Sequence, residues 1–201
     1  MATKYAIIST CSSDRFDYKL AADAAGQPRL AMLAYTRVDD EKESFSDPYV
    51  VLPDGWRMSP DAAAATGLTD DLLRGPGEPV LGALIAYMEL VKDGYVIVAY
   101  GAPHHMKLMR GEMRRAGMAD HYAETPYIDL MRAMTDVCRL PNPSGRKGFK
   151  FPKFAEALAH FGESCPEVRD AAFDMRASLL LFRELSTMGK LPAPRFPGAG
   201  D

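Results

Sequence analysis

Short apolar runs separated by polar turn segments divide the chain into a series of predicted elements. Runs of about four to eight apolar residues, bounded by Gly, Pro, Asn or Asp, are typical of buried strands. The second and third runs flank the charged turn "DDEKE", so these two strands are expected to be antiparallel neighbours. The strands predicted in this way cover residues 5–9, 29–39, 44–52, 95–100 and 126–130.

Apolar residues spaced three and four apart predict helices in the rest of the chain. One helix has a clear start, with Ser59 as the N-cap and Pro60 at the first helical position, and Gly67 is placed to end it. Further helices are predicted at 78–92, 104–117, about 152–161 and 168–188.

The order of the predicted elements indicates the fold class. Three strands come first, followed by helix, strand, helix, strand and further helices. This order is typical of a mixed α/β sheet in which an antiparallel portion is followed by a parallel portion. The sequence predicts one domain over residues 1–190. The Pro- and Gly-rich residues 191–201 are predicted to form a flexible tail.

Composition and charge narrow the possible functions. The chain has 201 residues, 47% of them apolar and 25% charged, as in an ordinary globular protein. Its net charge is −3, so a nucleic-acid site would have to be a local basic patch. The three cysteines match no zinc-binding spacing and are expected to be reduced thiols of a cytoplasmic protein. No signal peptide and no membrane-spanning apolar run is recognisable, so no membrane association is expected.

Polar residues at the ends of predicted strands indicate where a site would form. In open α/β sheets, ligands bind at the carboxyl ends of the strands. The tip of the first strand (9–13), the loop 101–105, Asp129 and the last helix with Asp174 are expected to meet there. Asp129 is itself expected to cap a helix or close a loop.

Several segments resemble one known family in order and spacing. Residues Ser9 to Asp14 correspond to the family pattern Asp-x-Glu-Thr-Thr-Gly. The other matching segments are "MSPDAAAATGLTDDLL", "VIVAYGAPHHMKLMRGEMRRAGM", "YIDLMRAM", "GFKFPKFAEALAHFGE" and "VRDAAFDMRASLLLFREL". Together they cover residues 4 to about 188 and resemble the DEDD-type (DnaQ-like) 3′–5′ exonucleases. The resemblance implies a ribonuclease H-like α/β fold, with three antiparallel strands, then parallel strands, flanked by helices.

The chain departs from this family at the positions that carry its catalysis. The family uses four carboxylates to hold two divalent metal ions and a histidine as general base. At the matching positions this chain has Ser9, Cys11, His105, Arg169 and Asp174, and only Asp174 is the family residue. One carboxylate is too few to hold two Mg²⁺ ions, and Arg169 stays protonated and so is no base. A catalytically degenerate member with no cofactor is therefore expected.

Alternative interpretations of the same positions remain open at this stage. An active 3′–5′ exonuclease would need Mg²⁺ or Mn²⁺ held by substitute ligands. A repurposed zinc site would use Cys11, His104, His105 and Asp174, because thiolate and imidazole suit that ion. Arg169 would either form a salt bridge with Asp174 in place of the metal or bind a phosphate.

Basic residues interleaved with aromatics in "GRKGFKFPKF" suggest a nucleic-acid contact, because such segments track the backbone and stack bases. The basic residues concerned are Arg146, Lys147, Lys150 and Lys153. A structural role for the phenylalanines, with solvated lysines, is the alternative. The expected partners are single-stranded nucleic acid, or a protein such as a polymerase, a nuclease or a regulator, with a homodimer also possible.

Overall fold

A mixed β-sheet forms the centre of the computed structural model, which describes residues 3–40, 42–143, 145 and 147–198. The described residues form six strands, in the order β3-β2-β1-β5-β6, with β4 also paired to β2. β1 is antiparallel to β2, and β2 to β3 and β4, whereas β1, β5 and β6 run parallel. The predicted antiparallel and parallel portions are thereby confirmed. The strands are β1 (Tyr5–Ser12), β2 (Leu30–Asp39), β3 (Lys42–Phe45), β4 (Tyr49–Val50), β5 (Val96–Ala99) and β6 (Tyr127–Asp129).

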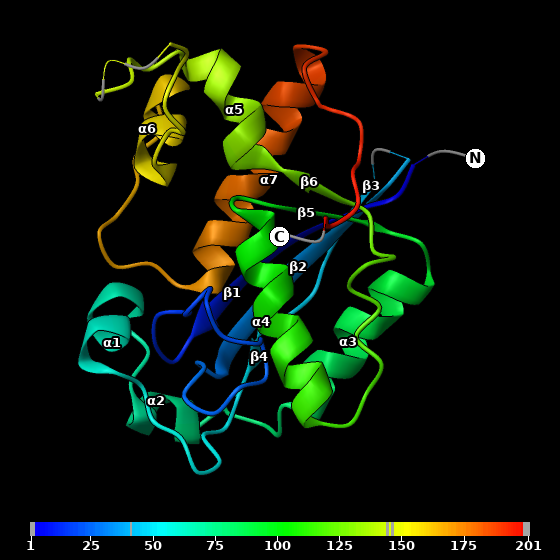
Figure 1. Cartoon of the computed structure of the whole chain (residues 1–201), viewed down its shortest axis with the longest axis vertical. Helices are drawn as coiled ribbons and strands as arrows, with labels where there is room; N and C mark the ends of the chain where they lie inside the picture. Colours follow the sequence, from blue (N-terminus) through cyan, green and yellow to red (C-terminus); the bar gives the residue numbers. More distant parts are fainter. Residues whose placement is uncertain (1–2, 41, 144, 146, 199–201) are drawn as a thin grey trace.

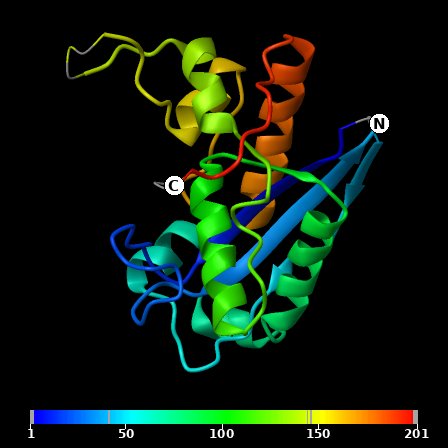
Figure 2. The same cartoon turned by 45° about the vertical axis from the view of Figure 1, so that its right-hand side comes forward.

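Helices cover both faces of the sheet (Figure 1). Successive side chains of β1 point to opposite faces of the sheet. Ile7 and Cys11 pack with α5, α6 and α7 on one face, whereas Ala6 and Ile8 pack with α3 and α4 on the other. Both cores contain aliphatic side chains and methionines together with aromatic residues, phenylalanines on the α7 side and tyrosines on the α3 and α4 side. The turned view in Figure 2 shows α3 and α4 on the side of the sheet opposite to α7. The helices are α1 (Pro60–Thr66), α2 (Asp70–Arg74), α3 (Leu81–Lys92), α4 (Ala102–Arg115), α5 (Leu130–Cys138), α6 (Phe154–His160) and α7 (Ala171–Thr187).

Three predicted boundaries differ from the structure for identifiable reasons. β1 continues to Ser12 instead of ending at residue 9, because its pairing with β2 extends to a bulge after Cys11. The predicted strand 44–52 is divided into β3 and β4, with Pro48, which has no N–H to donate, between them. The last helix starts at Ala171, because Asp170 accepts a hydrogen bond from the backbone N of Phe173 and acts as its N-cap.

The segment after α7 returns to the sheet and lies along β6 (Figure 1). Arg195 and Tyr127 exchange two backbone hydrogen bonds of 3.0 and 2.8 Å, as in an antiparallel pair. This contact departs from the flexible tail that the composition predicts for residues 191–201, because the open edge of β6 offers backbone partners. Residues 199–201 lie outside the described part of the chain.

Gly111 lets the loop between β1 and β2 approach α4 closely. An added Cβ at Gly111 would lie 2.3 Å from the carbonyl oxygen of Ala22, which is far inside van der Waals contact. The same carbonyl accepts a hydrogen bond from Arg115 Nη2, and Gln27 Nε2 donates to the carbonyls of Asp17, Leu20 and Ala21. The loop therefore has a fixed position against α4.

Substitution of Gly111 by alanine is expected to lower the free energy of unfolding by about 1–3 kcal/mol, because backbone has to move to make room. Urea unfolding measures this change. Gly82→Ala is the matched control: its Cβ would lie 3.8 Å from the Tyr49 ring, so it should be neutral or stabilising by about 0.5–1 kcal/mol. Equal behaviour of the two variants would contradict the close approach at Gly111.

Candidate functional site

A cleft of about 360 Å³ opens where the end of β1 meets α1, the start of α4 and the start of α7. It lies at the carboxyl end of β1, where the sequence predicts a site. The cleft is lined by Thr10, Cys11, Ser12, Asp14, Arg15, Asp61, Ala62, Ala65, Thr66, His104, Arg169 and Asp174.

Most of the predicted residues meet in or beside this cleft. Cys11, His104, Arg169 and Asp174 all line it. His105 lies behind the wall and contacts Thr10, whereas Ser9 is buried at 2% exposure and does not line the cleft. The first strand, the loop 101–105 and the last helix therefore meet at the cleft as predicted, whereas Asp129, which was expected there too, does not line it.

An ion pair occupies the centre of this arrangement. The Nε atom of Arg169 lies 2.8 Å from Oδ1 of Asp174, without a well-aligned hydrogen bond between them. Arg169 precedes α7 instead of lying on the predicted helix face, and its backbone N donates to the carbonyl of Ala65 in α1. Burial raises the pKa of Asp174 to about 6, although the Arg169 guanidinium acts in the opposite direction. The predicted salt bridge is present, and the backbone hydrogen bond from Arg169 to Ala65 links the start of α7 to α1.

Cys11 is a buried thiol and not a thiolate. Burial and, to a smaller extent, the neighbouring carboxylate of Asp174 raise the pKa of its thiol to about 12. The thiolate is the form that attacks substrates or binds metal ions. At neutral pH Cys11 therefore supplies neither a nucleophile nor a ready metal ligand.

His105 is engaged in hydrogen bonds to the backbone. Its Nδ1 accepts from the backbone N of Thr10 at 3.1 Å and contacts the Thr10 hydroxyl at 2.8 Å. Its Nε2 lies 3.3 Å from the carbonyl oxygen of Tyr100, an arrangement that places the ring proton on Nε2. Burial lowers its pKa to about 3, so the ring is neutral. His105 thus ties α4 to β1.

His104 forms the side wall of the cleft together with an aromatic group. The Tyr18 hydroxyl lies 2.9 Å from His104 Nδ1, and Phe16 packs against both rings. Burial lowers the pKa of His104. Tyr18 is 59% exposed, and the amine of Lys107 lies 5.3 Å from its ring centre. The wall therefore offers an exposed aromatic face beside the cleft.

The residues of the cleft do not fit the two-metal centre that the family resemblance implies. Among the five positions that match the family's catalytic residues there is one carboxylate, Asp174, which faces a guanidinium 2.8 Å away. The thiol of Cys11 is protonated, and the acceptor nitrogen of His105 already has a donor. Hard divalent ions need several carboxylate or carbonyl oxygens. Within the described residues, no group of three or more His, Cys, Asp or Glu side chains is arranged to hold a metal ion, and the zinc alternative gains no support from the geometry.

Asp129 lies at the end of β6 and has the role expected of it. Its Oδ1 accepts from the backbone N of Met131, which caps α5, and from the backbone N of Gly101. The carboxylate thereby fixes the turn that leads into α4. It does not line the cleft.

The predicted nucleic-acid residues lie before α6 and are only partly free. Lys150 forms an ion pair with Glu156 at 2.5 Å, whereas Lys147 and Lys153 are exposed. Phe149 and Phe151 are 43% and 54% exposed, and Phe154 is buried. Arg146 lies outside the described residues. None of the described side chains of this segment lines the cleft.

The outer half of the cleft is formed by residues that the sequence did not indicate. Arg15 and Asp61 face each other across its mouth, with Arg15 Nη2 3.2 Å from Asp61 Oδ2, and Thr66 lies deeper on α1. Both charged side chains are highly exposed, so this pair contributes little to stability. Arg15 follows the tip of the first strand, which was expected at the site, whereas Asp61 follows the Ser59 cap, which the sequence did not place there.

Comparison with solved structures relates this geometry to known proteins. No protein-family model matches the sequence, and no curated protein matches it. E. coli exonuclease I in complex with a dT13 oligonucleotide matches with a TM-score of 0.74 and 16% identity over 92% of this chain. The chain has the fold of exonuclease I. The zinc-bound complex of the E. coli enzyme with single-stranded DNA gives a TM-score of 0.72 at 17% identity over 92% of this chain. A product-bound structure of exonuclease I matches with a TM-score of 0.73 and 18% identity over 95% of this chain.

The exonuclease I fold confirms the predicted ribonuclease H-like architecture. The chain spans 41% of the exonuclease I chain in the dT13 complex and 45% of the chain in the product-bound structure. At identities of 16–18% the likeness concerns the fold. Among the described residues, no helix is long and apolar enough to cross a membrane.

Proposed function

We propose that this chain is a catalytically degenerate exonuclease-like protein that binds single-stranded nucleic acid without cleaving it. The observation that carries the proposal is the Arg169–Asp174 ion pair. A cationic side chain lies where the family resemblance implies a carboxylate-bound metal ion. Such a cation can still accept a phosphate group but supplies no activated water.

The lining of the cleft supports binding of a phosphodiester. The guanidinium of Arg169 has a planar set of donors that matches phosphate oxygens. Arg15, whose exposed guanidinium lines the mouth of the same cleft, is a second cation that can contact a phosphate. The exposed ring of Tyr18 beside His104 offers a surface on which a base can stack. The exonuclease I structure that matches this chain is itself a complex with dT13.

The test is an assay with a labelled single-stranded oligonucleotide and Mg²⁺ or Mn²⁺. The strand is expected to stay at full length and to bind with an affinity that falls as salt rises. Arg169→Gln should weaken binding roughly tenfold, because it removes the phosphate partner and leaves Asp174 facing the ligand. Arg176→Gln, an exposed cation on α7, is the matched control and should change little.

Two results would contradict the proposal. Metal-dependent shortening that disappears in Asp174→Ala would show an active exonuclease with substitute ligands. Neither binding nor cleavage would leave a protein-interaction role as the better explanation, and a pull-down with the intact chain would then identify the partner.

A further inference from the structure

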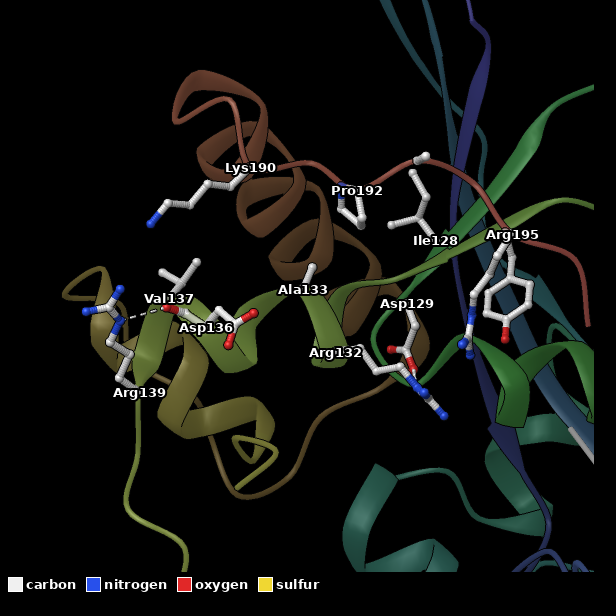
Figure 3. Close-up of a pocket in the computed structure, with 12 residues that line it drawn as sticks. Ile128, Asp129, Arg132, Ala133, Asp136, Val137, Arg139, Lys190, Pro192 and Arg195 are labelled. Carbon is white, nitrogen blue, oxygen red and sulfur yellow. Dashed lines mark hydrogen bonds and ion pairs between the residues drawn. The ribbon is translucent and has the colours of Figure 1, made fainter. Parts of the chain in front are cut away.

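A second depression lies at the opposite edge of the parallel strands and shares no lining residue with the cleft (Figure 3). This groove has a volume of about 540 Å³, within the range of small-molecule sites. Its walls are β6, α5 and the segment that follows α7. The groove is lined by Tyr127, Ile128, Asp129, Arg132, Ala133, Asp136, Val137, Arg139, Lys190, Pro192, Ala193 and Arg195.

The groove is cationic although the chain as a whole is acidic. Four basic side chains line it against two carboxylates, whereas the net charge of the chain is −3. One of the two carboxylates, Asp129, is buried and already accepts from two backbone N–H groups. Its Oδ2 lies 3.7 Å from Arg132 Nε. A concave basic surface of this kind concentrates anions.

Three of the four basic side chains, Arg139, Lys190 and Arg195, form no ion pair with a carboxylate in the part of the chain that the structure describes. Arg139 Nε donates to the backbone carbonyl of Asp136. Arg195 stacks over the Tyr127 ring at 4.8 Å, and its Nη2 is buried without a hydrogen-bond acceptor. The amine of Lys190 forms no ion pair there. A buried donor without an acceptor costs free energy that a ligand oxygen would recover. Figure 3 shows Arg132 and Arg195 extending past Asp129, and Lys190 extending toward the end of α5 where Arg139 lies.

Apolar and aromatic side chains accompany the charges. Ile128, Ala133, Val137 and Pro192 form the rest of the lining. The guanidinium of Arg132 lies 5.8 Å from the ring centre of Phe151, which is 54% exposed. The segment with exposed phenylalanines that the sequence singled out therefore lies next to this groove. An aromatic face beside a cationic groove suits a base linked to a phosphate.

We propose that this groove binds a nucleoside phosphate, either free or as a residue of a nucleic-acid strand. Arg195, Arg132 and Lys190 would hold the phosphate oxygens, and Phe151 would stack on the base. The inference goes beyond the proposed function, because it concerns a separate surface built from other residues.

Calorimetric titration of the intact chain with adenosine diphosphate at low salt tests the proposal. Adenosine diphosphate should bind, and adenosine should bind at least about tenfold more weakly, because it lacks the phosphates. Lys190→Gln and Arg195→Gln should each weaken binding about five- to tenfold. Phe151→Ala should weaken binding of adenosine diphosphate but not of inorganic pyrophosphate. Lys92→Gln, an exposed cation at the end of α3, is the matched control and should have no effect.

Amide NMR signals locate the ligand independently of the variants. Signals of Ala133 and Ala193 in the groove should shift on addition of adenosine diphosphate, whereas those of Ala62 and Ala65 in the cleft should not. A tetranucleotide that displaces adenosine diphosphate and binds more tightly would show that the groove takes a residue of a nucleic-acid strand. If the tetranucleotide does not displace adenosine diphosphate, the ligand is the free nucleotide. The proposal is overturned if adenosine diphosphate does not bind at millimolar concentration or if it shifts only signals of cleft residues. It is also overturned if Phe151→Ala binds adenosine diphosphate as tightly as the wild type does.

Discussion

Replacement of Glu112 by alanine is expected to lower the free energy of unfolding by about 3–5 kcal/mol, the cost of breaking a buried ion pair. Glu112 is 1% exposed on α4. Its carboxylate accepts from Arg29 Nε at 2.8 Å and Nη2 at 3.1 Å, from the backbone N of Leu30 at 3.0 Å and from Arg115 Nη1 at 3.1 Å. Alanine would leave all of these donors without their acceptor. The start of β2 would lose its attachment to α4.

Urea unfolding at constant pH measures this effect. Glu89→Ala, an exposed position on α3, is the matched control and should change stability by no more than about 0.5 kcal/mol. Glu112→Gln retains one acceptor oxygen, so its loss of unfolding free energy should lie between those of Glu112→Ala and Glu89→Ala. A loss below about 1 kcal/mol in Glu112→Ala would show that the two arginines find other acceptors.

Asp174→Asn is expected to raise the free energy of unfolding at pH 7. Burial raises the pKa of Asp174 from 3.8 to about 6, so the folded state holds the proton more tightly than the unfolded chain does. Stability therefore falls as pH rises from about 4 to about 6, and the cost stays at higher pH. This pKa difference already includes the opposing attraction to Arg169 and corresponds to at most about 3 kcal/mol, because the side chain of Asp174 is partly exposed. A gain of about 1–3 kcal/mol is expected.

The gain should shrink to about 0.5 kcal/mol at pH 4, where the folded wild type is protonated and the unfolded chain is about half ionised, and it should disappear below about pH 3. Thermal unfolding across this pH range measures it, with Asp61→Asn in the exposed mouth of the cleft as the matched control. Affinity for a single-stranded oligonucleotide should also rise in Asp174→Asn at pH 7, because Arg169 is no longer neutralised. A decrease in stability at pH 7 would show that the attraction to Arg169 outweighs the cost of burying Asp174.

The sheet could be predicted from the sequence because its central strands are continuous apolar runs. β1, β2 and β5 are buried on both faces, so their composition alone identifies them. β3 has exposed charged residues, and β4 has two residues. Both strands form by pairing with β2, and their own residues do not show this pairing. The start of α7 depends on the N-cap Asp170. Helix propensity alone does not show whether an aspartate caps a helix or lies within its first turn.

The cleft could be predicted in part because the carboxyl ends of strands meet at one edge of a sheet. The groove could not, because its walls come from 127–139 and 190–195, which only the fold brings together. The Pro-rich composition of residues 190–195 predicts a flexible chain end and gives no indication of a groove wall. Glu112 was missed among the charges of "MKLMRGEMRRAGM", although its spacing from Leu108 and Met109 places it on the buried side of the helix.

The backbone contact between Arg195 and Tyr127 has a consequence for self-association. An exposed strand edge is a template to which a strand of another molecule can add. Here the backbone groups of Tyr127 are occupied by the chain's own returning segment. At the other edge, β3 is four residues long and includes Lys42 and Glu43, which discourage edge-to-edge pairing. Polymerisation through this sheet should therefore be suppressed while the returning segment stays in place, and a chain truncated before Pro192 should be more prone to aggregate.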